Sequence, residues 1–512
     1  MDPQRYWRIA SRVLLILLTG VMYATVLDYG LAWDEYLQRL YGDAVLSWFT
    51  SGGQDRTAIE SGNLFLYGGL FDAVAQLWSR LSPLGVFEDR HLLTVACGLA
   101  TFAGARGLGI RFGGERAGFL ALLFAVLTPM LYGHAFNNPK DIPFAACFVW
   151  VLCLLVDTVR VLPALRVREL LPLGLVTGLL LAARPGGIFT WGYIATAWSV
   201  AAWTSRREPG WDRRRLALAF AAVCVLSWIV MIACWPFGLE SPLLNPLRAI
   251  RDASRFGWYA TTLFLGRAIP ARHPPLTYLP VWFGMQLPEF YFLGWALALA
   301  VWFRERRTAP PGTFYGPAFL VSAIAFPVVA AIVLRSTLYD ALRHVLFLIA
   351  PMAALAAWGV DTFLREKVPA FLRGGVALAL GLACGSVALD MVALHPYEAV
   401  YFNRLVAGGL RGASGRMETD YWGLSYREAL DWVVKNVPGP VRVGNCSIPI
   451  LSAYYLPQEA RGRLTHVADP NRAHILLATT RWNCHKRKGR VLHLVERQGV
   501  ALTYVLDMRT PP

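Results

Sequence analysis

The stretch VLLILLTGVMYATVLDYGLAWDEY, residues 13–36, joins a long apolar run to an acidic pair. Its apolar part predicts a membrane-spanning helix, because a span needs about 20 mainly apolar residues. Asp34 and Glu35 follow shortly after that run ends. Carboxylates are costly to keep close to lipid, so a pair of them at this place indicates a functional site.

The composition of the whole chain agrees with a membrane protein. The chain has 512 residues, of which 56% are hydrophobic and 16% are charged. A soluble protein of this kind would carry about 25% charged residues. The sequence therefore predicts an all-α polytopic membrane protein.

Eleven apolar runs are candidate spans. They cover residues 9–28, 89–108, 116–133, 142–160, 168–183, 187–204, 215–236, 280–303, 315–334, 343–364 and 373–393. The fifth run is short, and an Arg184-Pro185 break separates it from the sixth. Such a break is tolerated where it lies at the membrane surface or is covered by protein.

The basic residues predict the orientation of these spans. They gather before the first span and then in every second loop, at Arg106, Arg111 and Arg116; Arg160, Arg166 and Arg168; Arg206, Arg207, Arg213, Arg214 and Arg215; Arg304, Arg306 and Arg307; and Arg365, Lys367 and Arg373. Cytoplasmic loops carry such an excess, so we expect a cytoplasmic N-terminus. The net charge of +16 is explained in this way, and we expect no nucleic-acid partner. No signal-peptide cleavage site follows the first run, so we expect it to remain as a span.

This orientation places the less basic segments outside the cytoplasm. They are a first external loop (29–88), a second (132–143), a long third loop (237–279), the segment 335–344, and everything from residue 395 onward. Within the first loop, NLFLYGGLFDAVAQLW predicts a helix lying in the membrane interface. We therefore divide the chain into a transmembrane domain, 1–394, and an extracytoplasmic domain, 395–512.

The second domain reads as a small α/β unit. Apolar residues recur at helical spacing from Tyr426 to Val437. VRVGN and HILLAT predict short strands, and VLHLVERQGVALTYVLDM predicts a hairpin. We expect this domain to serve substrate docking or stability. Cys446 and Cys484 lie in it, and both a disulfide and two free thiols remain open.

Asp34 and Glu35 are the strongest candidates for chemistry. A carboxylate just outside the bilayer can take a proton from an acceptor hydroxyl, and it could also help to hold a divalent cation. The alternative is structural, with Asp34 as the N-cap of a helix that Glu35 begins.

Two further groups lie at the same predicted face. Asn138, Lys140 and Asp141 open the fourth span; Lys140 suits a phosphate, although an acidic first turn also suits a helix start. Arg184, Arg335, Arg343 and His344 are basic residues on the side where arginine is uncommon, with Tyr339 between them. Several such residues indicate a site for an anionic group such as a lipid phosphate.

These motifs resemble a known family. The acidic pair, YGGLFD, FNNPKDIPF and YDALRHVLFLIAP are similar to the bacterial membrane glycosyltransferases of family 39, which have the GT-C fold. Protein O-mannosyltransferases and the aminoarabinose transferase acting on lipid A belong to the same superfamily. HPYEAVYFN and DYWGLSYREALDW resemble one bacterial branch of it.

The resemblance implies an inner-membrane hexosyl- or pentosyltransferase. Such an enzyme takes a sugar from a polyprenyl-phosphate donor and transfers it to a lipid, glycan or protein acceptor on the outer face of the membrane. By this analogy Asp34 is the general base and Glu35 supports it. Lys140 and Asp141 help to arrange the donor or acceptor, and Arg343 and His344 meet the donor phosphate. Metal use varies in the superfamily, so the sequence predicts no definite metal ligand.

Two other functions compete with this one. A flippase for lipid-linked sugars needs polar groups through the bilayer midplane, whereas charged residues are nearly absent from these spans. A structural subunit of the cell envelope would leave the acidic pair unexplained.

Overall fold

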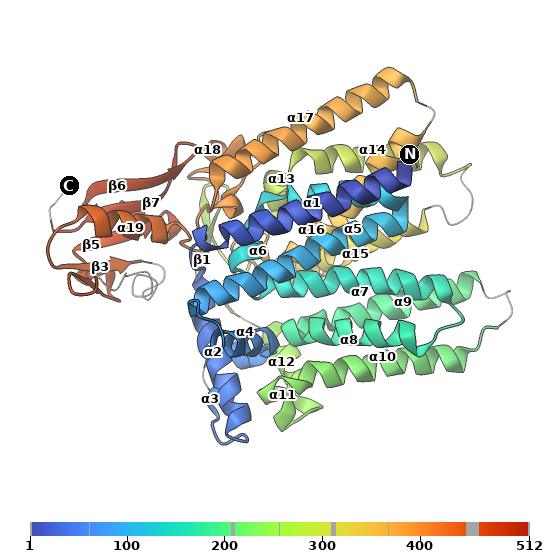
Figure 1. Ribbon diagram of the computed structural model, residues 1–512, viewed down its shortest axis with the longest axis horizontal. Helices are drawn as coiled ribbons and strands as arrows, with labels where there is room; N and C mark the ends of the chain where they lie inside the picture. Colours follow the sequence, from blue (N-terminus) through green and yellow to red (C-terminus); the bar gives the residue numbers. More distant parts are fainter. Residues whose placement is uncertain are drawn as a thin grey trace.

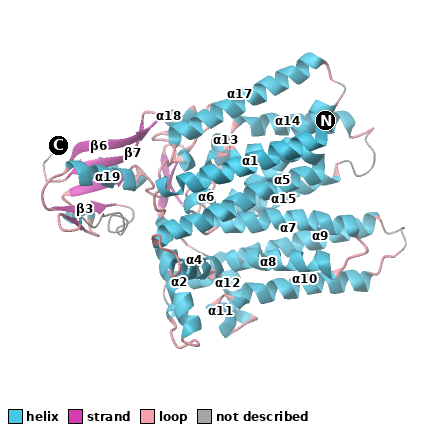
Figure 2. Cartoon of the chain, viewed as in Figure 1, coloured by secondary structure: helices cyan, strands magenta, loops and turns pink. Residues whose placement is uncertain are grey.

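The structure is a computed structural model that describes residues 3–60, 62–205, 210–254, 257–308, 314–366, 368–446 and 460–509. It consists of a bundle of long helices with a small sheet domain at one end (Figure 1). The strands gather almost entirely in that domain (Figure 2). Arg206, Arg207 and Lys367, predicted above as parts of basic loops, lie outside the described residues.

The bundle and the segments at its ends contain most of the helices. They are α1 (Pro3–Thr25), α2 (Trp33–Thr50), α3 (Thr57–Glu60), α4 (Leu70–Ser79), α5 (Val86–Val126), α6 (Pro129–Asn137), α7 (Asp141–Val161), α8 (Val167–Ala183), α9 (Phe189–Thr204), α10 (Arg213–Ala233), α11 (Pro236–Glu240), α12 (Leu244–Ser254), α13 (Tyr278–Gln286), α14 (Glu289–Glu305), α15 (Tyr315–Val333), α16 (Ile349–Arg365) and α17 (Ala370–Leu394). A two-stranded hairpin, β1 (Thr261–Phe264) and β2 (Arg267–Pro270), stands in the predicted third loop.

Seven helices in the described part of the chain are long and apolar enough to cross a membrane. They are α1, α5, α7, α10, α15, the segment Arg343–Arg365 and α17. The predicted count of eleven is not confirmed. Two predicted spans fall together in α5, which is broken at Gly114, and those at 168–183 and 187–204 form helices of only 17 and 16 residues. A multi-span membrane protein is nevertheless clear from the apolar side chains that α17 exposes, such as Leu382 (66% exposed) and Val392 (78% exposed).

Close backbone approach holds the middle of the bundle together. Helices α14 and α16 pack against each other, and a Cβ atom added at Gly359 of α16 would overlap the carbonyl oxygen of Gly294 in α14. Small residues let membrane helices approach in this way, and van der Waals packing then stabilises the pair. Helix α16 also packs along α5, so these helices form the core.

The segments that build the candidate site lie at the end of the bundle nearest the sheet domain. Figure 1 shows α2 and α4 there, beside the beginnings of α5 and α7. Helix α4 falls within NLFLYGGLFDAVAQLW, and its Leu77 and Trp78 are half exposed, at 52% and 48%. The predicted loop at 132–143 was too long, because α6 continues to Asn137. Pro129 in the first turn favours that helix, which is buried throughout.

The C-terminal domain contains a five-stranded sheet with the order β4-β3-β5-β7-β6. Its elements are α18 (Gly409–Ala413), α19 (Tyr426–Asn436), β3 (Val441–Asn445), β4 (Leu464–His466), β5 (Ile475–Thr479), the 3-10 segment η8 (Arg481–Lys486), β6 (Arg490–Arg497) and β7 (Val500–Asp507). The predicted helix, the two strands and the hairpin of β6 and β7 are confirmed. A disulfide joins Cys446 to Cys484, which resolves the alternative that the sequence left open.

Candidate functional site

Asp34 lies in the first turn of α2 and faces a buried arginine. Arg343 Nη1 donates a hydrogen bond to Asp34 Oδ2 at 2.8 Å. The Asp34 side chain keeps 25% of its surface exposed, whereas that of Arg343 keeps 4%. The N-cap of α2 is Ala32, so the alternative in which Asp34 is the cap is wrong. The Asp34 side chain therefore does not cap the helix, and part of it is accessible to solvent.

Glu35 has a different position from its neighbour. It is fully buried, and its Oε2 accepts a hydrogen bond from the Ala32 backbone N–H at 2.7 Å. His91 of α5 approaches its other oxygen at 3.0 Å. Glu35 thus stabilises the start of α2 by accepting the backbone N–H of the N-cap residue, and it ties that helix to α5. The structure places Asp34 and Glu35 on different sides of the helix start, so support of a base by Glu35 stays a prediction.

Asp141, at the start of α7, is held by two neighbours. Its Oδ1 pairs with Arg184, and its Oδ2 accepts a hydrogen bond from Asn138 Nδ2 at 2.9 Å. Asn138 Oδ1 in turn accepts the Asp141 backbone N–H at 2.9 Å. Arg184, predicted as part of a site for an anionic group, reaches this position from the break after α8.

Lys140 stands over an aromatic ring between these groups. Its Nζ lies 3.8 Å from the centre of the Tyr67 ring, in the YGGLFD motif. Gly68 makes this arrangement possible, because a Cβ atom there would overlap the carbonyl oxygen of Ala182 at the end of α8. Within the described residues, Lys140 is paired with no carboxylate. It is therefore the cation best placed to take an incoming anion.

Tyr339 and His344 complete the predicted set. Arg343 Nη2 donates to the Tyr339 hydroxyl at 3.2 Å, and the rings of Tyr339 and His344 meet edge to face with centres 4.7 Å apart. Tyr339 also stacks on Trp258 at 4.1 Å. Arg335, the remaining basic residue of the predicted group, is exposed.

The electrostatics of the site centre on Asp34. Burial raises the pKa of this carboxyl, but the positive charges of Arg343, Lys140 and Arg184 outweigh burial and bring its pKa below the usual value. Asp34 is consequently ionised at neutral pH. All three cations therefore contribute positive charge at the Asp34 carboxylate, although only Arg343 contacts it directly.

Several residues at the site were missed by sequence reasoning. Trp422, in the motif DYWGLS, places its ring 5.1 Å from the Arg343 guanidinium carbon, and the neighbouring Tyr421 hydroxyl contacts His134 Nε2 at 2.9 Å. Arg481 pairs with Asp340. The motif itself was recognised, but its contact with the transmembrane domain depends on how the two parts pack. For the contact between Arg481 and Asp340, the local sequence signal was the adjacent pair Arg481 and Trp482.

Metal binding gains no support from this geometry. The described residues contain no group of three or more His, Cys, Asp and Glu side chains arranged to hold a metal ion. Asp34 and Asp141, the carboxylates predicted for the site, are both paired with arginine.

Comparisons with known proteins identify the fold. No protein-family model and no curated protein matches the sequence. The structure is similar to ArnT from Cupriavidus metallidurans bound to undecaprenyl phosphate, with a TM-score of 0.53, 16% identity, and 96% of this chain and 97% of ArnT covered. The apo state of the same protein gives a TM-score of 0.52 at 15% identity, over 96% and 97% of the two chains. The chain therefore has the GT-C fold, as its sequence motifs predicted.

Proposed function

We propose that this protein transfers a sugar from a polyprenyl-phosphate donor to an acceptor of the cell envelope, on the outer face of the membrane. The observation that carries the proposal is the pairing of one partly exposed carboxylate, Asp34, with a cluster of cations that can bind a phosphate. ArnT, which shares the fold over nearly its whole length, binds undecaprenyl phosphate. The acceptor is a glycolipid, a polysaccharide or a protein.

The cations would hold the donor phosphate. Arg343 presents a planar guanidinium group, which suits two oxygens of a phosphate, and Lys140 adds a point charge. A phosphate entering beside Lys140 would compete with Asp34 for Arg343 and with Asp141 for Arg184. At each arginine, the phosphate would take the place of a carboxylate, so Arg343 and Arg184 would each keep an anionic partner during binding.

The same exchange would prepare Asp34 for catalysis. While Arg343 donates to it, the carboxylate is stabilised and is a weak base. A phosphate that takes over Arg343 removes this stabilisation and adds a negative charge nearby, which raises the pKa of Asp34 toward the working pH. A base is most effective when its pKa lies near that pH.

The transfer itself would be a single displacement. Asp34 accepts the proton of the acceptor hydroxyl while the hydroxyl oxygen forms a bond to the anomeric carbon. The bond from that carbon to the phosphate oxygen breaks, and the electron pair leaves with the polyprenyl phosphate. Arg343 and Lys140 stabilise the charge that the leaving phosphate gains. Such a displacement inverts the configuration of the sugar.

An assay with membranes and a radiolabelled polyprenyl-phosphate sugar tests the proposal. We expect Asp34→Asn to lower the transfer rate by roughly 10²- to 10⁴-fold, the usual contribution of a general base. Asp43→Asn is the matched control, since Asp43 lies on the same helix and pairs only across one turn with Arg39, at 3.6 Å. Full activity of Asp34→Asn would exclude Asp34 as the base, and absence of transfer from any polyprenyl-phosphate sugar would exclude the reaction.

A further inference from the structure

Arg481 of the C-terminal domain reaches into the candidate site without touching the groups expected to react. We propose that it is a positioning residue, which acts through Asp340 on Arg343 and so keeps Arg343 directed at Asp34. The inference rests on the proposed function and extends it, because it makes the C-terminal domain a working part of the site.

A row of alternating charges connects the two domains. Arg481 Nη2 lies 2.8 Å from Asp340 Oδ1, and Asp340 Oδ2 lies 3.5 Å from Arg343 Nε. Arg343 Nη1 then donates to Asp34. The side chains of Arg481, Asp340 and Arg343 keep only 3 to 4% of their surface exposed. At such depth, water screens the charges little, so a change at one end of the row is felt at the other.

The position of Arg481 is fixed by more than its ion pair. The backbone carbonyl of Tyr421 accepts a hydrogen bond from Arg481 Nη1 at 2.5 Å. Its guanidinium carbon also lies 4.8 to 5.7 Å from the ring centres of three tryptophans, namely Trp33, Trp258 and Trp482. Trp33 belongs to the same AWDEY stretch as Asp34. Cation–π contacts of this kind are stabilising, and they are stronger when they are desolvated.

The backbone on both sides of the ion pair is held in an uncommon conformation. Asp340 and Ala341 have φ values of 56° and 60°, and Trp482 and Asn483 have 50° and 57°. None of the four is glycine, so this left-handed conformation is energetically unfavourable at each of them. Residues of this kind persist only where surrounding contacts determine them, and they cluster at functional sites.

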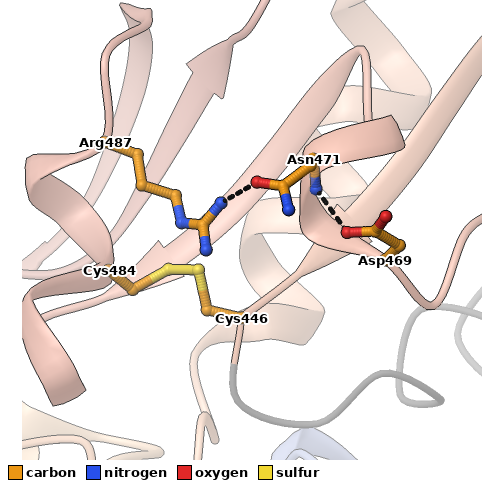
Figure 3. The surroundings of a disulfide bond; sticks show 5 residues. All are labelled: Cys446, Asp469, Asn471, Cys484 and Arg487. Carbon is orange, nitrogen blue, oxygen red and sulfur yellow. Dashed lines mark hydrogen bonds between the residues drawn. A yellow bond between two sulfur atoms is a disulfide. The ribbon is translucent and has the colours of Figure 1, made fainter.

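Covalent and polar contacts hold η8, the segment that carries Arg481, from its other end. Figure 3 shows the disulfide between Cys446 and Cys484, with Arg487 directed at Asn471. Arg487 Nη1 donates to Asn471 Oδ1 at 2.6 Å. The left-handed turn at 482–483 is thus anchored on one side by the disulfide and on the other by the ion pair with Asp340.

Removal of the Arg481 charge has a specific consequence for Arg343. Asp340 would be left with Arg343 as its remaining buried cation among the described residues, and the two would pair more closely. Arg343 would then offer less positive charge to Asp34 or to a phosphate. A lysine at 481 would keep the charge, whereas glutamine would not.

Binding of undecaprenyl phosphate to the purified full chain in detergent, measured by native mass spectrometry, tests this. We expect Arg481→Gln to weaken binding at least fivefold, and Arg481→Lys to restore most of the affinity. Arg427→Gln is the matched control, because Arg427 also joins the C-terminal domain to the transmembrane domain, through the backbone carbonyls of Leu27 and Tyr29. Its affinity should equal that of the wild type. Equal affinity for Arg481→Gln and wild type would overturn the positioning role.

A double-mutant cycle separates this inference from the proposed function. The melting temperatures of Asp34→Asn, Arg481→Gln and the double variant are measured without ligand. If the row of charges is coupled, the double variant loses less than the sum of the two single losses. Wild-type protein that binds no undecaprenyl phosphate would overturn the proposed function alone, while strictly additive losses would overturn the positioning role.

Discussion

Glu418 gives a pH-dependent test of how the C-terminal domain is docked. Its side chain is buried, with 4% of the residue exposed, and Oε1 accepts a hydrogen bond from the Leu263 backbone N–H at 3.3 Å. Burial raises the pKa of this carboxyl, the charge of Arg481 lowers it, and the charge of Asp340 raises it. Together these effects bring the pKa to about 7.

The sign of the effect on stability follows from the direction of that shift. A folded-state pKa above the unfolded value of 4.5 means that the folded protein holds this proton more tightly. The resulting stabilisation is complete below pH 4.5 and is lost as the pH rises to about 7. One pKa unit corresponds to about 1.4 kcal/mol, so the loss across this window is about 3 kcal/mol.

Glu418→Gln removes the titration while keeping the shape of the side chain. We therefore expect the melting temperature of the variant, relative to that of the wild type, to rise between pH 4.5 and 7 and to stay level above it. The measurement is thermal unfolding of the purified protein in detergent at several pH values. Comparison of the variant with the wild type at each pH removes the contributions of all other groups.

Glu428→Gln supplies a control of opposite sign. Burial raises the pKa of Glu428, but hydrogen bonds from Arg497 and Tyr397 outweigh it and lower the pKa below the usual value. Its contribution is therefore present above the unfolded value of 4.5 and is lost as the pH falls below it, so this variant should lose stability relative to the wild type as the pH rises toward 4.5 and change little above it. A difference between Glu418→Gln and wild type that does not change from pH 4.5 to 7.5 would refute the reasoning about burial.

Two further predictions concern packing and the disulfide. Gly359→Ala should lower the melting temperature, because its Cβ atom meets the backbone of α14. Gly381→Ala, with open space around it on α17, should leave the melting temperature equal or slightly higher. Thermal unfolding checks both variants, and equal melting temperatures would contradict the packing argument. Cys446→Ser should destabilise the C-terminal domain by about 4 kcal/mol, which is the loop-closure value for the 38-residue separation of Cys446 and Cys484. Denaturant unfolding measures this loss, with Cys384→Ser as the control for a free cysteine. A loss no larger than that of the control would contradict the prediction.

The sequence predicted the fold class because membrane helices leave a strong record of apolar runs. It predicted the number of spans less well. Residues 168–204, for example, are apolar enough for two spans but form helices α8 and α9 that are too short by length alone. The length of a helix depends on where caps and breaks such as Arg184-Pro185 fall, and hydropathy does not record these positions.

The candidate site was predictable where charge stood at the end of a span. Asp34, Lys140, Asp141, Arg184 and Arg343 were all identified by that rule, and the structure brings them together. Glu35 satisfied the same rule but is occupied by the backbone of Ala32 and by His91. Spacing along the chain shows that two carboxylates are adjacent, but not that Asp34 stays partly exposed while Glu35 is buried.

The missed residues Trp422 and Arg481 share a different property, since both come from the far side of a domain interface. Trp422 and Arg481 lie more than a hundred residues from Asp34 in the sequence, and nothing in their local pattern indicates a partner in the transmembrane domain. Their contacts depend on docking, which is a property of tertiary packing. The local sequence offers only a weak signal of such a contact, namely an arginine next to a tryptophan, as at Arg481 and Trp482.

The pairing of the site's charges explains how several cations can be held in a largely buried region of the protein. A buried charge without a partner costs several kcal/mol. Arg184 and Arg343 avoid that cost because each has a carboxylate partner, and Arg481 shares Asp340 with Arg343. Lys140 differs, because its charge faces the Tyr67 ring and not a carboxylate. An anion such as a phosphate displaces a ring face more easily than it displaces a carboxylate. Under the proposed function, an entering phosphate would therefore meet Lys140 first, and the arginines would exchange partners afterwards.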